Sequence, residues 1–182
     1  MRSKQPAQDT ADRRHAVVIG GSMAGLLAAR VLSDHFEQVT LIERDRLTGD
    51  AEARKGIPQG RHVHGWLARG VAIMGEYFPD LFPTLTRDGA IPVGTDGVRW
   101  NQLGVWMAPL PSPVKAPFQS RPFLEQHVRD QLAARDNVRI MDACEVSQLC
   151  AHNDRITGVV LRYRTGEQHE EALSADLVVD TS

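Results

Sequence analysis

The sequence has few cysteines, and their number and spacing indicate the redox compartment of the protein. Cys144 and Cys150 are the only two in 182 residues. On one extended strand their Cα atoms would lie about 20 Å apart, at about 3.3 Å per residue. A disulfide tolerates at most about 7 Å between Cα atoms. We therefore expect two free thiols and a reducing, cytoplasmic location.

A basic excess and a long apolar run are also absent. The formal net charge is −2 and the pI is near 6.4, which argues against nucleic acid or an anionic membrane surface as a partner. No segment reaches the 18 or so uninterrupted apolar residues that a membrane span needs. With 42% hydrophobic and 24% charged residues, the composition is that of an ordinary globular domain.

One N-terminal feature has two interpretations. Arg13 and Arg14 precede an apolar run at 16–29, as in a twin-arginine export signal. A nucleotide-binding strand, turn and helix has the same composition, and residues 38–43 add a second strand that ends in an acid. An export signal does not need that strand, so we favour nucleotide binding, preceded by a disordered tail at 1–14.

Hydrophobic periodicity predicts an α/β fold. Buried strands are expected at 15–19, 38–43, 137–141 and 175–180, and helices at 22–33, 64 to about 77, and 121–135. Between them we expect a loop at 44–62, helical turns broken by Pro79 and Pro83, short strands within 91–109 and a proline-rich connector at 108–117. Alternating residues predict three further strands at 143–151, 155–164 and 168–173.

The three alternating strands decide between two nucleotide-binding folds. An NAD-binding Rossmann half would normally cross over through a helix, whereas a three-stranded β-meander at this point favours the FAD-type variant. The sequence thus predicts a Rossmann-like FAD-binding fold with a parallel sheet and a meander crossover, incomplete at the C-terminus.

The turn after the first strand approximates a dinucleotide-binding fingerprint. Its residues are Gly20, Gly21, Ser22, Met23, Ala24 and Gly25. Gly20 allows the tight turn and Gly25 lets the helix pack closely on the strand. The helix N-terminus then offers backbone N–H groups to a pyrophosphate. Ser22 stands where the middle glycine is expected, which restricts the approach of the backbone but adds a hydroxyl donor.

Glu43 ends the second predicted strand. An acid at this position is expected to meet the ribose hydroxyls of the nucleotide. A carboxylate there would repel a 2′-phosphate and so disfavours NADP. The other interpretation is a glycine-rich turn in an unrelated α/β protein with a solvated Glu43.

Beyond these patterns, the sequence resembles the flavoprotein monooxygenase superfamily, which includes para-hydroxybenzoate hydroxylases, squalene epoxidases and geranylgeranyl reductases. The resemblance covers nearly all of the chain after residue 14. The segments that carry it are GGSMAGLLAARVL at 20–32, VTLIERD at 39–45, SRPFLEQHVRDQLA at 120–133 and ADLVVDTS at 175–182. The segment RKGIPQGRHVHGWLARG at 54–70 is similar to a bacterial subgroup.

The resemblance implies a set of cofactor contacts. The turn from Gly20 to Gly25 would hold the FAD pyrophosphate, and Glu43 the adenosine ribose. Arg44 would lie near the adenine or the phosphates, Arg121 along the cofactor, and the backbone around Val146 beside the adenine. For Arg44 and Arg121 an ordinary solvated arginine is the alternative.

The polar segment at 58–64 is open to several interpretations. The resemblance implies that it lies near the flavin and pyrophosphate, with Arg61 as a phosphate or substrate contact. A solvated loop is the alternative. His62 and His64 could form half a metal site, but no further ligand stands at a suitable spacing, so we expect no metal. No residue here is assigned a proton-transfer role.

The resemblance implies an activity for a longer protein. It is a monooxygenase that uses FAD, NAD(P)H and O2 to hydroxylate or epoxidise a small organic substrate. Because the substrate-binding sheet and the later flavin-binding segments of the family are missing, we expect an inactive N-terminal fragment, with 64–118 an excursion toward the substrate domain. An NAD-binding dehydrogenase domain and a non-catalytic truncated remnant are the alternatives.

Overall fold

A computed structural model gives the architecture of the protein. It describes residues 13–54, 57–94, 97–108, 115–165 and 169–182. The chain divides into two compact units, of which the first combines Met1–Arg46 with Asn137–Ser182 and the second is Leu47–Asp136. Most of the predicted tail at 1–14 lies outside the described residues.

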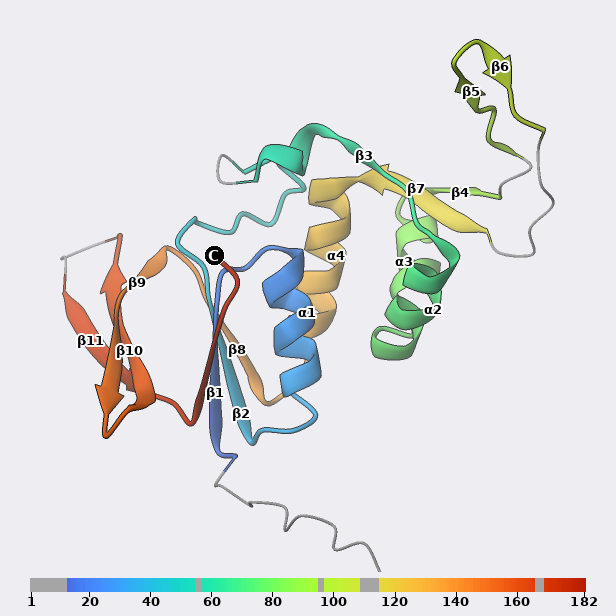
Figure 1. Ribbon diagram of the computed structural model, residues 1–182. Helices are drawn as coiled ribbons and strands as arrows, with labels where there is room; N and C mark the ends of the chain where they lie inside the picture. The colour runs from blue at the N-terminus through green and yellow to red at the C-terminus, as the bar shows by residue number, and fades with distance from the viewer. Residues whose placement is uncertain (1–12, 55–56, 95–96, 109–114, 166–168) are drawn as a thin grey trace, which may run out of the picture. The chain divides into compact units, whose positions relative to one another are not determined.

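A four-stranded parallel sheet forms the centre of the first unit (Figure 1). In spatial order its strands are β12 (Leu177–Asp180), β1 (His15–Ile19), β2 (Gln38–Ile42) and β8 (Val138–Met141). All three neighbouring pairs are parallel, so the four carboxyl ends meet at one edge. Ile19 pairs with Ile42 on one side and with Asp180 on the other. All four strands were predicted at these places.

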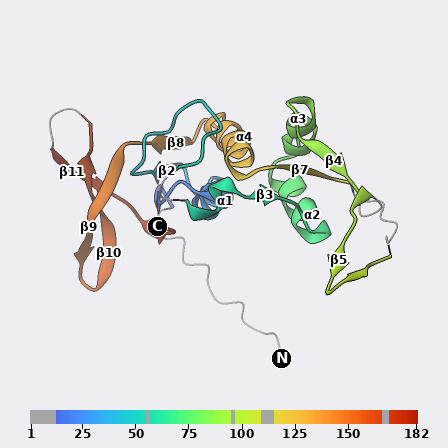
Figure 2. The same cartoon turned by 90° about the horizontal axis from the view of Figure 1, so that it is seen from above.

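The two faces of this sheet are covered differently, as both views show (Figures 1 and 2). Helix α1 (Met23–Leu32) lies on one face and buries Leu26 and Ala29. The other face carries an antiparallel meander of β9 (Cys144–His152), β10 (Arg155–Tyr163) and β11 (Glu170–Ser174). The predicted parallel sheet with a meander crossover is therefore confirmed.

A single apolar cluster joins the sheet to the meander. Its fully buried members include Val17 and Ile42 from the sheet, and Val159 and Leu161 from β10. Cys144 belongs to the same cluster, and burial raises the pKa of its thiol. Both cysteines are free, as expected.

In its described residues, the second unit has a small antiparallel sheet and three α-helices. The sheet has the order β3 (Val63–His64), β7 (Ala116–Ser120), β4 (Ile91–Val93). The helices are α2 (Ala68–Tyr77), α3 (Leu81–Arg87) and α4 (Arg121–Ala133). Their buried apolar residues are Met74, Phe78, Leu81, Leu85, Leu124, Val128 and Leu132. Of the helices that the structure describes, none has the length and apolar character to cross a bilayer.

The structure corrects three predictions in the second unit. The helix predicted from His64 begins at Ala68, because His64 pairs with Gln119 in the small sheet and is extended. Pro83 does not break a helix but sits in the first turn of α3, where the backbone N–H has no helical acceptor to lose.

The third correction concerns the connectors. Residues 58–61 of the predicted loop form a 3₁₀ turn, Pro58–Arg61. Ala116 and Pro117 of the predicted proline-rich connector belong to β7, while 109–114 lie outside the described residues.

A two-stranded hairpin with exposed apolar side chains completes the second unit. It pairs β5 (Asn101–Gln102) with β6 (Val105–Trp106). Leu103 and Gly104 turn the chain with φ angles of 51° and 83°, the left-handed conformation that a tight hairpin turn requires. Short strands were predicted in this region.

Candidate functional site

The candidate site begins with the turn that joins β1 to α1. Gly20 has a φ of +98°, which a residue with a Cβ adopts only at a cost in free energy. Its N–H donates to the carbonyl of Ile42 at 2.8 Å. The turn is thus fastened to the end of β2.

Close packing explains the glycine at the other end of the turn. A Cβ atom on Gly25 would lie 1.8 Å from the carbonyl oxygen of Gly20, inside any van der Waals contact. Only glycine therefore lets α1 start directly against the end of β1, as the fingerprint predicts.

The start of α1 supplies the backbone donors of the site. Ser22 precedes the helix in an extended conformation, and its carbonyl accepts from the N–H of Leu26 at 2.9 Å. Met23 and Ala24 form the first turn with Gly25. N–H groups at this position have no acceptor within the helix and, with the helix dipole, favour an anion.

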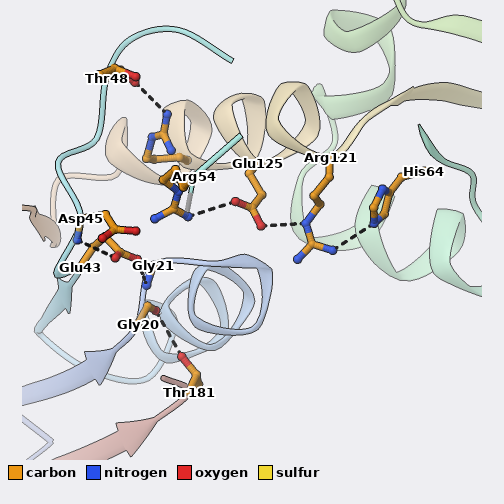
Figure 3. A network of polar contacts seen from close by, with 11 residues as sticks. Gly20, Gly21, Glu43, Asp45, Thr48, Arg54, His64, Arg121, Glu125 and Thr181 are labelled. Carbon is orange, nitrogen blue, oxygen red and sulfur yellow. Dashed lines mark hydrogen bonds and ion pairs between the residues drawn. The ribbon is translucent and has the colours of Figure 1, made fainter. Parts of the chain in front are cut away.

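Glu43 ties the turns after β1 and β2 together (Figure 3). Its Oε2 accepts from the N–H of Gly21 at 2.8 Å and its Oε1 from the N–H of Asp45 at 2.9 Å. The residue is only 6% exposed. A buried carboxylate satisfied by backbone donors stays fixed at the carboxyl edge of the sheet, next to the turn.

Thr181 is a further member of this edge that the sequence did not indicate. Its hydroxyl donates to the carbonyl of Ile19 at 2.7 Å and lies 3.2 Å from that of Gly20 (Figure 3). A Cβ on Gly20 would meet Thr181 Oγ1 at 3.0 Å. The predicted strand at 175–180 placed a threonine at a strand end, but not beside β1, because strand order is set by long-range pairing.

The structure brings seven of the predicted contacts together in the first unit. They are Gly20, Gly21, Ser22, Met23, Ala24, Gly25 and Glu43. Arg44 follows them on the surface, with Nε 3.8 Å from Asp45 Oδ1. Val146 lies on β9, pairs with Leu161 and packs on the cluster between sheet and meander.

The remaining predicted contacts lie in the second unit. Arg121 is the first residue of α4, and its Nε donates to Glu125 Oε1 at 2.7 Å. Its Nη1 lies 3.3 Å from His64 Nε2. Arg54 donates to the other oxygen of Glu125 at 3.1 Å. Arg61 ends the 3₁₀ turn and is exposed.

Arg54 and Glu125 were not among the predicted site residues. The spacing of Arg121 and Glu125, one helical turn apart, is a readable signal for an ion pair. Nothing in the sequence links Arg54 to a residue 71 positions away.

The histidines of the polar segment do not form a metal site with their neighbours. His64 Nδ1 lies 3.1 Å from the carbonyl oxygen of His62. Within the described residues, no group of three or more His, Cys, Asp or Glu side chains could hold a metal ion.

Comparison with solved structures places the fold. The p-nitrophenol 4-monooxygenase PnpA of Pseudomonas putida DLL-E4 superposes with a TM-score of 0.64 at 18% identity, over 93% of this chain and 40% of that one. The myxobacterial chondrochloren halogenase CndH, an FAD-dependent halogenase, also reaches 0.64, at 19% identity, over 93% of this chain and 37% of its own. The chain shares its fold with part of each enzyme.

Sequence comparison adds a mycobacterial relative. Protein Rv3254 of Mycobacterium tuberculosis is 36% identical over an alignment of 179 residues that covers 92% of this chain. This chain spans only 37% of the length of that relative. No family model matches the sequence.

Proposed function

We propose that this chain is the part of a flavin-dependent oxidoreductase that binds the ADP portion of FAD. The observation that carries the proposal is the carboxyl edge of the parallel sheet, where the glycine turn, the start of α1 and the buried Glu43 meet. In open α/β sheets, ligands bind at this edge. The shared fold with an FAD-dependent halogenase and a monooxygenase supports FAD as the nucleotide.

Each residue of the site has a proposed task. The N–H groups of the turn and of the first residues of α1 bind the pyrophosphate. Glu43 accepts from the ribose hydroxyls. Arg44, Arg61, Arg121 and the backbone of Val146 are proposed as further contacts along FAD. Bound FAD supplies the redox chemistry, and no side chain of this chain is assigned a catalytic role.

For the longer protein we propose a monooxygenase. It would use NAD(P)H and O2 to hydroxylate or epoxidise a small organic substrate, in the cytoplasm. The fold is shared equally well with a halogenase, so halogenation is the alternative reaction type. An NAD-binding dehydrogenase domain and a non-catalytic remnant are the competing functions.

A thermal-shift titration with FAD, ADP and NAD tests the proposal. A ligand that binds only the folded state stabilises it by about 2.7 kcal/mol at 100 times its dissociation constant. We expect FAD and ADP to stabilise the chain. Glu43→Ala should abolish the shift, and Glu43→Gln should reduce it while keeping an acceptor oxygen for Gly21. Glu37→Ala, an exposed acid of the same unit, is the matched control.

The titration also separates the competing functions. Stronger stabilisation by NAD than by FAD would favour the dehydrogenase. A cooperatively folded chain that responds to none of the three ligands would leave the remnant as the better description.

A further inference from the structure

Glu125 is the most buried acid of the second unit among the residues that the structure describes. It is 3% exposed, in the second turn of α4. Its Oε1 accepts from Arg121 Nε at 2.7 Å and its Oε2 from Arg54 Nη2 at 3.1 Å (Figure 3). The side chains of the two arginines are themselves only 14% and 13% exposed. One buried carboxylate therefore pairs with two guanidinium groups that are themselves mostly shielded from water.

Burial makes this arrangement stiff. A carboxylate removed from water is stable only when it is paired and hydrogen-bonded. Charge-assisted contacts of this kind are short and directional. The guanidinium positions of Arg54 and Arg121 are therefore coupled to Glu125 and through it to each other. The coupling joins the segment before the 3₁₀ turn to the start of α4.

A second contact fixes the plane of the Arg121 side chain. Arginine has no acceptor, so His64 Nε2 must accept from Arg121 Nη1, 3.3 Å away. On the other side of the ring, His64 Nδ1 lies 3.1 Å from the carbonyl oxygen of His62. Glu125 and His64 therefore contact two different nitrogens of one planar guanidinium, Nε and Nη1.

We infer that Glu125 is a positioning residue that holds the guanidinium of Arg121 in the conformation that binds FAD. The inference rests on the proposed function, in which Arg121 contacts FAD. Glu125 itself is not among the residues proposed to contact FAD. An arginine on a flexible stem loses much rotamer freedom when it binds, and a guanidinium already held in place loses less. Glu125 would thus raise the affinity for FAD without contacting it.

FAD binding to the 182-residue chain and its variants tests this inference. The variants are Glu125→Gln, Glu125→Asp, Arg121→Gln and the double variant Glu125→Gln with Arg121→Gln. We expect Glu125→Gln and Arg121→Gln each to weaken FAD binding about tenfold. The double variant should bind no more weakly than Arg121→Gln, because both changes remove the same contact. Glu125→Asp, which keeps the carboxylate, should recover part of the affinity.

Two measurements separate positioning from folding. The Arg121 Nε–H signal in an NMR spectrum, assigned by its loss in Arg121→Gln, should shift in Glu125→Gln and lie nearer to its original place in Glu125→Asp. Glu76→Gln, an exposed acid on α2, is the control and should change neither this signal nor the affinity. Should Glu125→Gln fail to fold, Glu125→Asp alone still reports, through a smaller loss of FAD affinity and a smaller shift.

Several outcomes would overturn the inference. A Glu125→Gln chain that binds FAD as tightly as the unchanged chain, while Arg121→Gln binds weakly, overturns it and leaves the proposed function intact. So does a double variant whose loss is the product of the two single losses. An Arg121→Gln chain with full affinity removes the contact on which it rests. A folded unchanged chain that binds neither FAD nor ADP overturns the proposed function and this inference together.

Discussion

At the scale of single residues, Gly25 decides whether the glycine turn can form. A methyl group there would overlap the carbonyl oxygen of Gly20, and backbone atoms cannot move aside as a side chain can. We predict that Gly25→Ala lowers the free energy of unfolding by about 1–3 kcal/mol, the usual cost of overpacking. The same substitution should abolish ADP binding. Urea denaturation and the ADP thermal shift measure the two effects.

The matched control for this substitution is Gly49→Ala. A Cβ at Gly49 meets no atom within 4 Å, so stability and ADP binding should stay unchanged. A Gly25→Ala chain as stable as the Gly49→Ala chain would show that the start of α1 can retreat from β1.

Residue-level prediction from the sequence succeeded where the chemistry is local. Gly20 and Gly25 are readable because a tight turn and a close helix need glycine at fixed spacing. Thr181 and Glu125 were not readable as members of their networks. Each acts through partners that only the fold brings near, the carbonyl of Ile19 for Thr181 and Arg54 for Glu125.

At the scale of elements, the strands and helices with clear periodicity were predicted well. The five-residue β1 matches its predicted bounds, and the two-residue turn between β9 and β10 falls between the strands predicted at 143–151 and 155–164. That turn uses Asn153 and Asp154 with positive φ angles, as a hairpin of this length requires. The helix predicted from His64 was wrong because the residues around His64 have no strong hydrophobic period. There, pairing with Gln119 decides the conformation, and His64 is in a strand.

Helix α4 offers an element-scale test, because it carries Arg121 and Glu125 and begins at a side-chain cap. Ser120 Oγ accepts from the N–H of Phe123 at 3.3 Å. We predict that Ser120→Ala destabilises the second unit by about 0.5–2 kcal/mol and speeds exchange of the Phe123 amide hydrogen. Hydrogen exchange followed by NMR measures the second effect directly.

Ser120→Asn should largely preserve the protection, since asparagine also caps helices. Equal exchange rates in Ser120→Ala and in the unchanged chain would mean that the hydroxyl contributes nothing to the start of α4.

At the scale of the whole molecule, the chain builds its first unit from both of its ends. Strand β1 pairs with β2 nearby and with β12 more than 160 positions later. The sequence predicted every one of these strands, yet not that Leu47–Asp136 forms a compact unit of its own. Unit boundaries depend on contacts between distant residues, which hydrophobic periodicity does not record. The predicted excursion at 64–118 falls inside this unit and remains a prediction as to its role.

The β5–β6 hairpin and the residue before it expose several large apolar side chains. Leu103 is 97% exposed, Trp106 65% and Trp100 61%, so several large apolar side chains gather on one short ribbon. Exposed apolar patches of this kind bind dyes and promote association. We predict that Leu103→Ser combined with Trp106→Ser lowers the fluorescence of the dye ANS and the light scattering of concentrated samples. The melting temperature should stay the same, because these side chains bury little area.

The control is Leu67→Ser, which replaces a leucine that is 84% exposed but lies outside the hairpin. Scattered apolar residues are normal on a protein surface, so this change should leave dye binding and scattering as they were. If Leu67→Ser lowered them as much as the hairpin variant, association would follow total exposed apolar area. A reduction confined to the hairpin variant would instead show that dye binding and association depend on the clustering of the apolar side chains on one ribbon.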